Sequence, residues 1–165
     1  DLDELVNQQL AKMLFANPQR IDYYDRYQEI IDAYNAEQNR ATIEKTFMDL
    51  MELASSLDTE QQRYVREGFS SDEELSVYDL LFLENLTKQE IETIKKVSVD
   101  LLTKIKQQIA KLDHWTDKQE TKAIVDNLIR NTLWQELPNS YDVSDIQTYQ
   151  KKIYEYVYMR YPEVA

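Results

Sequence analysis

The sequence predicts an all-α fold: a compact bundle of about seven or eight helices with short connections and no sheet. Three observations predict it. Only one glycine, Gly68, and three prolines occur in 165 residues, so few residues interrupt helices. Capping signatures stand directly before runs of apolar residues at helical spacing. No segment alternates apolar and polar residues with the period of two that a half-buried strand requires.

The predicted helices are separated by connections of a few residues. Their apolar positions recur at the spacing of one helix face. In chain order, we expect helices at 2–15, 20–38, 42–56, 59–67, 72–83, 88–112, 117–136 and 145–160.

The ends of several helices are marked by residues with a known capping or breaking effect. A Ser/Thr-x-x-Glu/Gln signature predicts a capped start, because the first side chain accepts a backbone hydrogen bond of the first turn. Such signatures begin at Ser71, Thr87 and Ser144. Proline and glycine predict the stops. Pro18 follows the first helix, Gly68 the fourth, Pro138 the seventh and Pro162 the last.

The helix predicted at 88–112 has the clearest amphipathic pattern. At 100° per residue, one arc holds its apolar side chains. They are Ile91, Ile94, Val97, Leu101, Leu102, Ile105, Ile109 and Leu112. Lys88, Lys95 and Lys106 border this arc. We therefore expect one face to pack and its margin to be basic.

We expect residues 1–17 to form an N-terminal helix, a candidate link to an upstream domain, and residues 18–165 to form a single helical C-terminal domain. The first residue is Asp1 and not Met, which suggests a part of a longer protein. No stretch approaches the ~18 to 20 apolar residues of a membrane span, and no signal peptide is visible. The chain has no cysteine, which fits a reducing compartment. We expect a cytoplasmic protein without membrane contact.

The net charge of −12 argues against a general nucleic-acid binder. The charge is unevenly distributed, since residues 1–87 hold seven Lys/Arg and 19 Asp/Glu, whereas residues 88–165 hold 12 of each. Within the neutral half, residues 88–111 carry six lysines and three acidic residues. If the domain contacts DNA, this helix is the expected place; a solvated helix face is the alternative.

The sequence shows no constellation of catalytic residues. His114 is the only histidine, and we expect it at a surface or capping position. One histidine and no cysteine cannot supply a zinc site. Glu120-Thr121-Lys122 matches the E-x-K end of a nuclease signature, but that signature lies on a strand and this segment has a helical pattern. We expect no catalytic residue, no metal site and no cofactor in this chain.

Twelve tyrosines occur, and most of them lie in the second and last predicted helices. Most share an arc with isoleucines and are expected in the core. Tyr154 and Tyr158 fall outside the apolar arc of the last helix, one turn apart. Exposed tyrosines favour a protein interface; stacking on bases and simple partial burial are the alternatives.

Two stretches of the sequence resemble the C-terminal region of the R (motor) subunit of type I restriction-modification enzymes. One runs from Trp115-Thr116-Asp117-Lys118-Gln119-Glu120-Thr121-Lys122-Ala123 through Ile129-Arg130 to Leu137-Pro138-Asn139-Ser140-Tyr141. The other comprises Ile30-Ile31-Asp32-Ala33-Tyr34-Asn35 and Arg40-Ala41-Thr42-Ile43-Glu44. The family pattern usually has Arg at the position of Lys122, and lysine would weaken a forked contact there.

The resemblance implies a non-catalytic domain that helps to assemble the motor subunit with a methyltransferase core of M and S subunits. The parent protein would then be an ATP-dependent DNA translocase and endonuclease, with ATP and Mg²⁺ bound by upstream domains. The implied partners are the M and S subunits and the rest of the R subunit. Direct, sequence-independent DNA binding through the lysine-lined helix is the alternative.

Two sets of candidate residues accompany these hypotheses. An acidic surface suits a basic protein patch, and exposed tyrosines suit an interface. The candidate interface residues are Asp72, Glu73, Glu74, Tyr154 and Tyr158. The candidate DNA contacts are Lys95, Lys96, Lys106, Lys118, Lys122 and Arg130.

Overall fold

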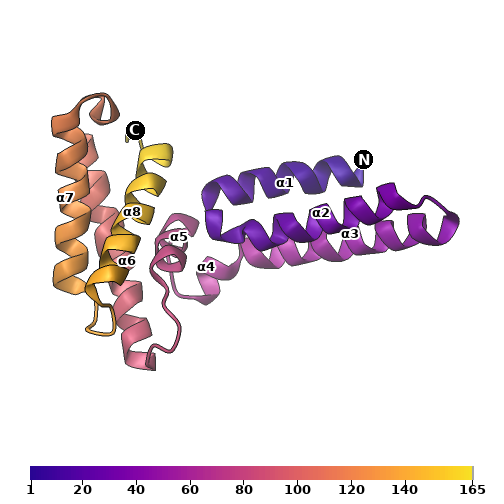
Figure 1. Cartoon of the computed structure of the whole chain (residues 1–165), viewed down its shortest axis with the longest axis horizontal. Coiled ribbons are helices and arrows are strands. Elements are labelled where there is room, and N and C mark those ends of the chain that lie inside the picture. The colour runs from indigo at the N-terminus through magenta and orange to yellow at the C-terminus, as the bar shows by residue number, and fades with distance from the viewer. Residues whose placement is uncertain (165) are drawn as a thin grey trace. The chain divides into compact units, whose positions relative to one another are not determined.

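The computed structural model describes residues 1–164. This part of the chain contains eight α-helices, two short 3₁₀ segments and no strand, which confirms the predicted all-α fold (Figure 1). The elements are α1 (Leu2–Ala16), η1 (Pro18–Arg20), α2 (Ile21–Ala36), α3 (Arg40–Gln61), α4 (Arg63–Arg66), α5 (Asp72–Leu81), α6 (Lys88–Ala110), η2 (Trp115–Asp117), α7 (Gln119–Glu136) and α8 (Val143–Arg160).

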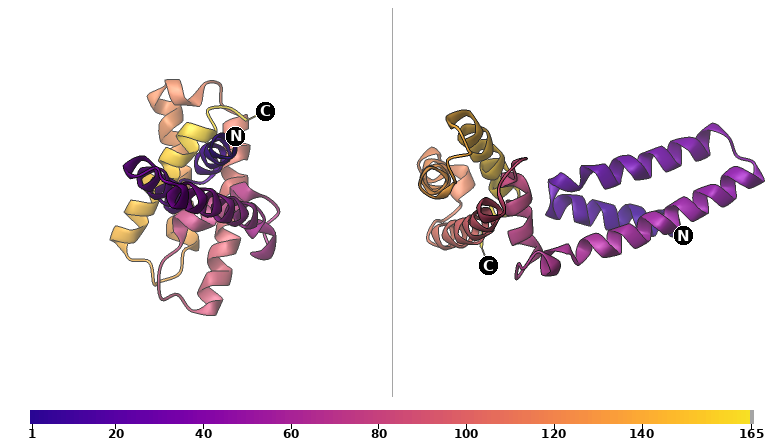
Figure 2. Two further views of the ribbon diagram at one scale, coloured as in Figure 1. Left: turned by 90° about the vertical axis from the view of Figure 1, so that its right-hand side faces the viewer. Right: turned by 90° about the horizontal axis from the view of Figure 1, so that it is seen from below.

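The chain forms two units, Asp1–Ser76 and Val77–Ala165, and the boundary between them falls within α5. In the first unit, α2 and α3 run antiparallel as a helical hairpin, with α1 alongside (Figure 2). These three helices share one apolar core. Its buried residues are Val6, Leu10, Met13, Tyr27, Leu50, Leu53 and Leu57.

The prediction of separate helices at 42–56 and 59–67 is wrong in its boundaries. A single helix, α3, covers residues 40–61, and α4 is one short turn. Leu50, Leu53 and Leu57 are all buried on one face, so the apolar stripe continues through the expected break. Neither glycine nor proline stands there to end the helix.

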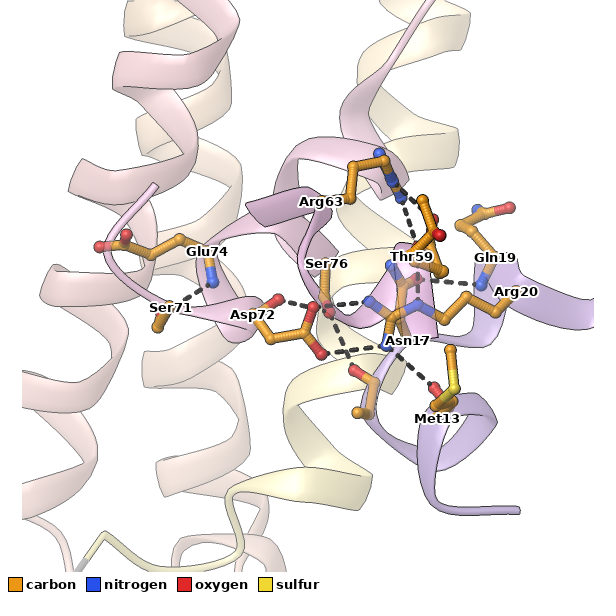
Figure 3. Close-up of polar contacts among 12 residues, drawn as sticks. Met13, Asn17, Gln19, Arg20, Thr59, Arg63, Ser71, Asp72, Glu74 and Ser76 are labelled. Atoms are coloured by element: carbon orange, nitrogen blue, oxygen red, sulfur yellow. Dashed lines mark hydrogen bonds and ion pairs between the residues drawn. The ribbon is translucent and has the colours of Figure 1, made fainter. Parts of the chain in front are cut away.

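A buried ion network joins three elements of the first unit (Figure 3). The Arg20 guanidinium donates through Nε to Glu60 Oε2 at 2.9 Å, and through Nη1 and Nη2 to the two carboxylate oxygens of Asp72 at 3.0 and 2.6 Å. Arg63 also donates to both oxygens of Glu60, at 2.9 and 3.1 Å. Ser76 Oγ donates to the Ala16 carbonyl at 2.9 Å. The network fixes the first turn of α5 to η1 and to the end of α3.

Gly68 ends α4 as the sequence predicts. Its φ is +86°, a conformation in which a side chain would be strained. The Gly68 N–H bonds to the Val65 carbonyl at 3.0 Å, and the Phe69 N–H bonds to the Tyr64 carbonyl at 2.9 Å. This pair of bonds is a Schellman motif, which satisfies carbonyls that the helix end would otherwise leave open.

The second unit packs α6, α7 and α8 around a core of its own. The predicted capping box of α6 is confirmed, because Thr87 and Glu90 exchange side-chain-to-backbone hydrogen bonds. The predicted cap of the last helix is wrong. Asp142, not Ser144, forms the capping box of α8, with Asp145 as its partner. The helix begins earlier because Tyr141 is buried and its hydroxyl donates to the Leu81 carbonyl, which brings Asp142 to the helix start.

Candidate interaction site between α7 and α8

A buried tryptophan supports two tyrosines on α8. Trp115, in the connection between α6 and α7, is fully buried, and its indole N–H donates to the Tyr161 carbonyl at 2.7 Å. Tyr154 and Tyr158 both pack edge-to-face against Trp115, with ring centroids 6.0 and 5.8 Å away. Such pairs contribute about 0.5–1.5 kcal/mol beyond the area they bury. The two tyrosine rings are therefore held in place before any partner arrives.

These two tyrosines line an open hollow of about 350 Å³ between α7 and α8. The other residues that line it are Lys122 from α7 and Glu155 and Met159 from α8. Met159 is 63% exposed and Tyr158 is 38% exposed, whereas Tyr154 is half-buried. The hollow thus combines apolar surface, one ammonium and one carboxylate.

The surroundings of Tyr154 keep its hydroxyl neutral. Burial, followed by the nearby negative charge of Asp126, raises the pKa of Tyr154 above its ordinary value. Asp126 Oδ1 itself accepts a hydrogen bond from Gln150 Nε2 at 3.1 Å, which ties α7 to α8 beside the hollow. At neutral pH the Tyr154 hydroxyl is a hydrogen-bond donor. The arrangement is suited to binding a partner group through aromatic contact and polar bonds.

Only one of the six candidate DNA contacts, Lys122, lies in this hollow. Lys95 and Lys106 lie over the rings of Tyr78 and Tyr161, with Nζ 5.9 and 5.4 Å from the ring centroids. Lys96, Lys118 and Arg130 are exposed, on α6, before α7 and on α7 respectively. The structure thus does not gather the six cations into one cluster at the hollow.

The three acidic candidates form the first turn of α5 and differ in their surroundings. Asp72 is held by Arg20. Glu73 is exposed, whereas Glu74 accepts a hydrogen bond from the Ser70 backbone N–H at 2.8 Å. Ser71 Oγ accepts from the Glu74 N–H at 3.2 Å, which agrees with the predicted capping role of Ser71. Glu73 is therefore the most exposed of the three acidic candidates.

Sequence reasoning missed three residues of the α7–α8 site. Glu155 and Met159 follow the two tyrosines on the outward side of the same helix, so a helical wheel of residues 145–160 contains the signal for them. Trp115 has no such signal. Its position depends on the chain reversal at His114, a non-glycine residue with φ +47°. His114 itself is exposed, in agreement with the expected surface position.

Metal-binding clusters and membrane-spanning helices are both absent from the described part of the chain. Residues 1–164 contain no group of three or more His, Cys, Asp or Glu side chains arranged to hold a metal ion. None of the helices in this range is long and apolar enough to cross a membrane.

Comparison with known proteins assigns the chain to a family. The family model described as "Type I restriction enzyme HindI endonuclease subunit-like, C-terminal" matches residues 1–161. No curated protein and no solved structure matches the chain. The match covers nearly the whole sequence and confirms the resemblance found from its helix and turn patterns. The chain therefore belongs to the family of C-terminal domains of type I restriction endonuclease subunits.

Proposed function

We propose that this domain attaches the endonuclease subunit to the methyltransferase core of M and S subunits, and that the hollow between α7 and α8 is a docking contact. The observation that carries the proposal is the pair of tyrosines braced by Trp115 beside exposed Met159. Tyrosine and methionine are enriched at protein interfaces, where rigid aromatic rings bury area at a low cost in conformational entropy. In the parent enzyme, ATP and Mg²⁺ belong to upstream domains.

The mixed charge of the hollow supports a protein partner over a nucleic acid. Glu155 lines the hollow, and the Asp126 carboxylate acts on Tyr154. Both would repel phosphate groups, whereas a protein segment can offer an apolar side chain to the rings and a cation to Glu155. Lys122 would then pair with a carboxylate of the partner.

Co-elution tests this proposal. The 165-residue chain is mixed with a purified M and S core at physiological salt, with and without duplex DNA. Co-elution without DNA supports a protein-docking domain. The variant Tyr158→Ala is expected to weaken the complex about tenfold, as for an interface residue worth more than about 1 kcal/mol. Tyr24→Ala is the matched control, since Tyr24 on α2 has the same exposure of 38%.

Equal weakening by Tyr158→Ala and Tyr24→Ala would argue against the α7–α8 hollow as the contact. Circular dichroism of both variants shows whether the helices remain intact. Co-elution only in the presence of DNA would favour the second function.

The second candidate function is direct DNA binding, which one observation favours. Lys96, Lys118 and Arg130 are exposed and form no side-chain ion pair within residues 1–164. Phosphate contacts by such cations make affinity fall steeply with salt. Alanine at Lys118 and Arg130 should then weaken binding to every DNA sequence equally and reduce the salt slope by roughly 1 per lost contact. A flat salt dependence would exclude this function.

A further inference from the structure

The outer side of α3 carries a second set of apolar residues that takes no part in the core. Ile43, Phe47 and Met51 are 49%, 58% and 51% exposed. Their spacing of four residues places them along one side of the helix, next to the stripe that packs in the core. Met48, 70% exposed, lies beside them. We call these four residues the α3 strip.

The α3 strip leads into a hollow of about 290 Å³ at one end of the first unit. Ile43 and Phe47 belong to both features. The remaining lining residues come from the first turn of α1, from α2 and from α3. They are Asp1, Leu2, Asp3, Ile31, Tyr34, Thr46 and Leu50. In Figure 1 the hairpin of α2 and α3 extends past the first turn of α1. An apolar strip and a concave end therefore form one continuous surface.

The charge around this surface is negative. The first unit, residues 1–76, contains seven Lys/Arg and 17 Asp/Glu. The cations nearest in sequence to the strip are paired on their own helix, Arg40 with Glu44 at 3.2 Å and Lys45 with Asp49 at 2.6 Å. Glu52, exposed beside Met51, forms no ion pair with a Lys or Arg side chain within the described residues. Asp3 lines the hollow, and its Oδ1 accepts a hydrogen bond from the Tyr27 hydroxyl at 2.5 Å.

We propose that the α3 strip and its hollow bind a basic amphipathic helix of a protein partner. The strip runs from Ile43 to Met51, a rise of about 12 Å along α3, which fits two to three turns of an opposing helix. One bulky apolar side chain of that helix fills the hollow, and its Lys or Arg residues lie against the acidic surroundings. Charge complementarity selects a cationic occupant, because a negatively charged helix would meet repulsion on both sides.

A second copy of the chain does not fit this surface. Two first units would each bring the same excess of ten negative charges and repel each other. The lysine-rich helix of the chain, α6, cannot serve as the occupant either. Its apolar residues Ile94, Leu101 and Ile105 are fully buried in the second unit. This proposal goes beyond the docking function proposed above, since it concerns a different surface in the other unit.

The four methionines allow a direct test by nuclear magnetic resonance. Met48 and Met51 lie on the α3 strip, Met13 is buried in the core of the first unit, and Met159 lies at the α7–α8 hollow. The 165-residue chain is labelled at the methionine methyl groups and titrated with an 18-residue helical peptide of Leu and Lys, with Lys on its polar face. We expect shifts for Met48 and Met51, and none for Met159 or Met13.

Two comparisons sharpen this test. A peptide with the same leucines and Glu in place of Lys should bind at least tenfold more weakly, and added salt should weaken the Lys peptide. The variant Phe47→Ser should weaken the Lys peptide at least tenfold, whereas Val65→Ser should not. Val65 is the matched control because it has the same exposure, 58%, on α4.

Several outcomes would overturn the proposal. Equal affinity for the Lys and Glu peptides would contradict the preference for a basic helix. Equal weakening by Phe47→Ser and Val65→Ser would contradict binding at the α3 strip. Shifts of Met159 instead of Met48 and Met51 would place the peptide at the α7–α8 hollow. If sedimentation shows that the chain is a dimer and that Phe47→Ser is a monomer, the α3 strip binds a second copy of the chain and not a basic helix. Loss of co-elution by Tyr158→Ala is a separate result and leaves this test unaffected.

Discussion

Replacing Arg20 by methionine is expected to destabilise the first unit by about 3 kcal/mol. The Arg20 side chain is 3% exposed and serves two carboxylates, those of Glu60 and Asp72 (Figure 3). Breaking a buried ion pair by removing one partner costs about 3–5 kcal/mol, because the remaining charge is left buried without compensation. The carboxylates of Glu60 and Asp72 would both lose the Arg20 guanidinium as a partner.

Two features place the expected cost at the lower end of this range. Glu60 keeps its two hydrogen bonds from Arg63, so its charge is not left alone. The Asp72 side chain is 32% exposed, so water can solvate it after the loss of Arg20. Methionine also fills much of the volume of the arginine stem and limits the cavity.

Urea unfolding followed by circular dichroism measures this change. With a slope of about 2 kcal/mol per molar urea, a loss of about 3 kcal/mol lowers the midpoint by roughly 1.5 M. Trp115 and Trp134, both in the second unit, report that unit separately by fluorescence. Arg40→Met is the control, because Arg40 and Glu44 form an exposed pair with side chains 93% and 66% accessible, worth at most about 0.5 kcal/mol. Equal midpoint shifts in the two variants would refute the reasoning.

Three further changes test other parts of the structure. Glu60→Gln tests pH dependence: Glu60 loses water on burial, which raises its pKa, but hydrogen bonds from Arg63 and Arg20 outweigh this and lower it overall. A carboxyl whose pKa is lower in the folded state stabilises that state at pH values above its unfolded pKa of about 4.3. The free energy of unfolding of the wild type should therefore exceed that of Glu60→Gln at pH 7, and this difference should become smaller below about pH 4. Tyr141→Phe removes the donor to the buried Leu81 carbonyl and should cost about 1–2 kcal/mol, seen by tryptophan fluorescence. Gly68→Ala meets no atom within 4 Å, so only the left-handed backbone opposes it, and thermal unfolding should show a loss of about 1 kcal/mol; no loss would contradict the strain argument.

The helices could be predicted from the sequence because local signals control them. The Thr87 capping box and the Gly68 stop depend on residues within one turn, and both occur as expected. The errors arose where a distant contact decides the boundary. Leu57 continues the apolar stripe of α3 because α1 and α2 cover it, and α8 starts after Asp142 because Tyr141 is anchored on Leu81. For α3, the helical spacing of Leu50, Leu53 and Leu57 did carry a signal for one continuous helix, whereas the Tyr141–Leu81 contact leaves no trace in the local pattern.

The candidate site was predictable only in part, for the same physical reason. The spacing of Tyr154 and Tyr158 marks them as lying outside the apolar arc of their helix. Their support by Trp115 depends on packing across about 40 residues of chain and was not predictable. Arg20 and Asp72 are 52 residues apart, and no sequence pattern links them. A tertiary ion pair of this kind requires knowledge of which helix ends meet.

The Arg20–Asp72 pair also changes how the acidic candidate surface must be tested. Asp72, Glu73 and Glu74 cannot be reversed together as three equivalent surface charges, because Asp72 is bound by Arg20. Asp72→Lys places an ammonium beside the Arg20 guanidinium, so we expect loss of helical signal or a midpoint far below that of wild type. Glu73 is exposed, and an exposed ion pair contributes only about 0–1 kcal/mol, so Glu73→Lys should lower the free energy of unfolding by at most about 1 kcal/mol.

Glu73→Lys is therefore the variant that separates assembly from folding. If the acidic turn of α5 meets a basic patch of the M and S core, this variant should weaken co-elution, and more so at low salt, where charge interactions reach further. Unchanged co-elution of Glu73→Lys would show that the acidic first turn of α5 does not contact the M and S core. If Asp72→Lys loses co-elution and Glu73→Lys keeps it, the loss reports damage to the first unit. The reason is that the Asp72 carboxylate accepts two hydrogen bonds from Arg20 within the fold.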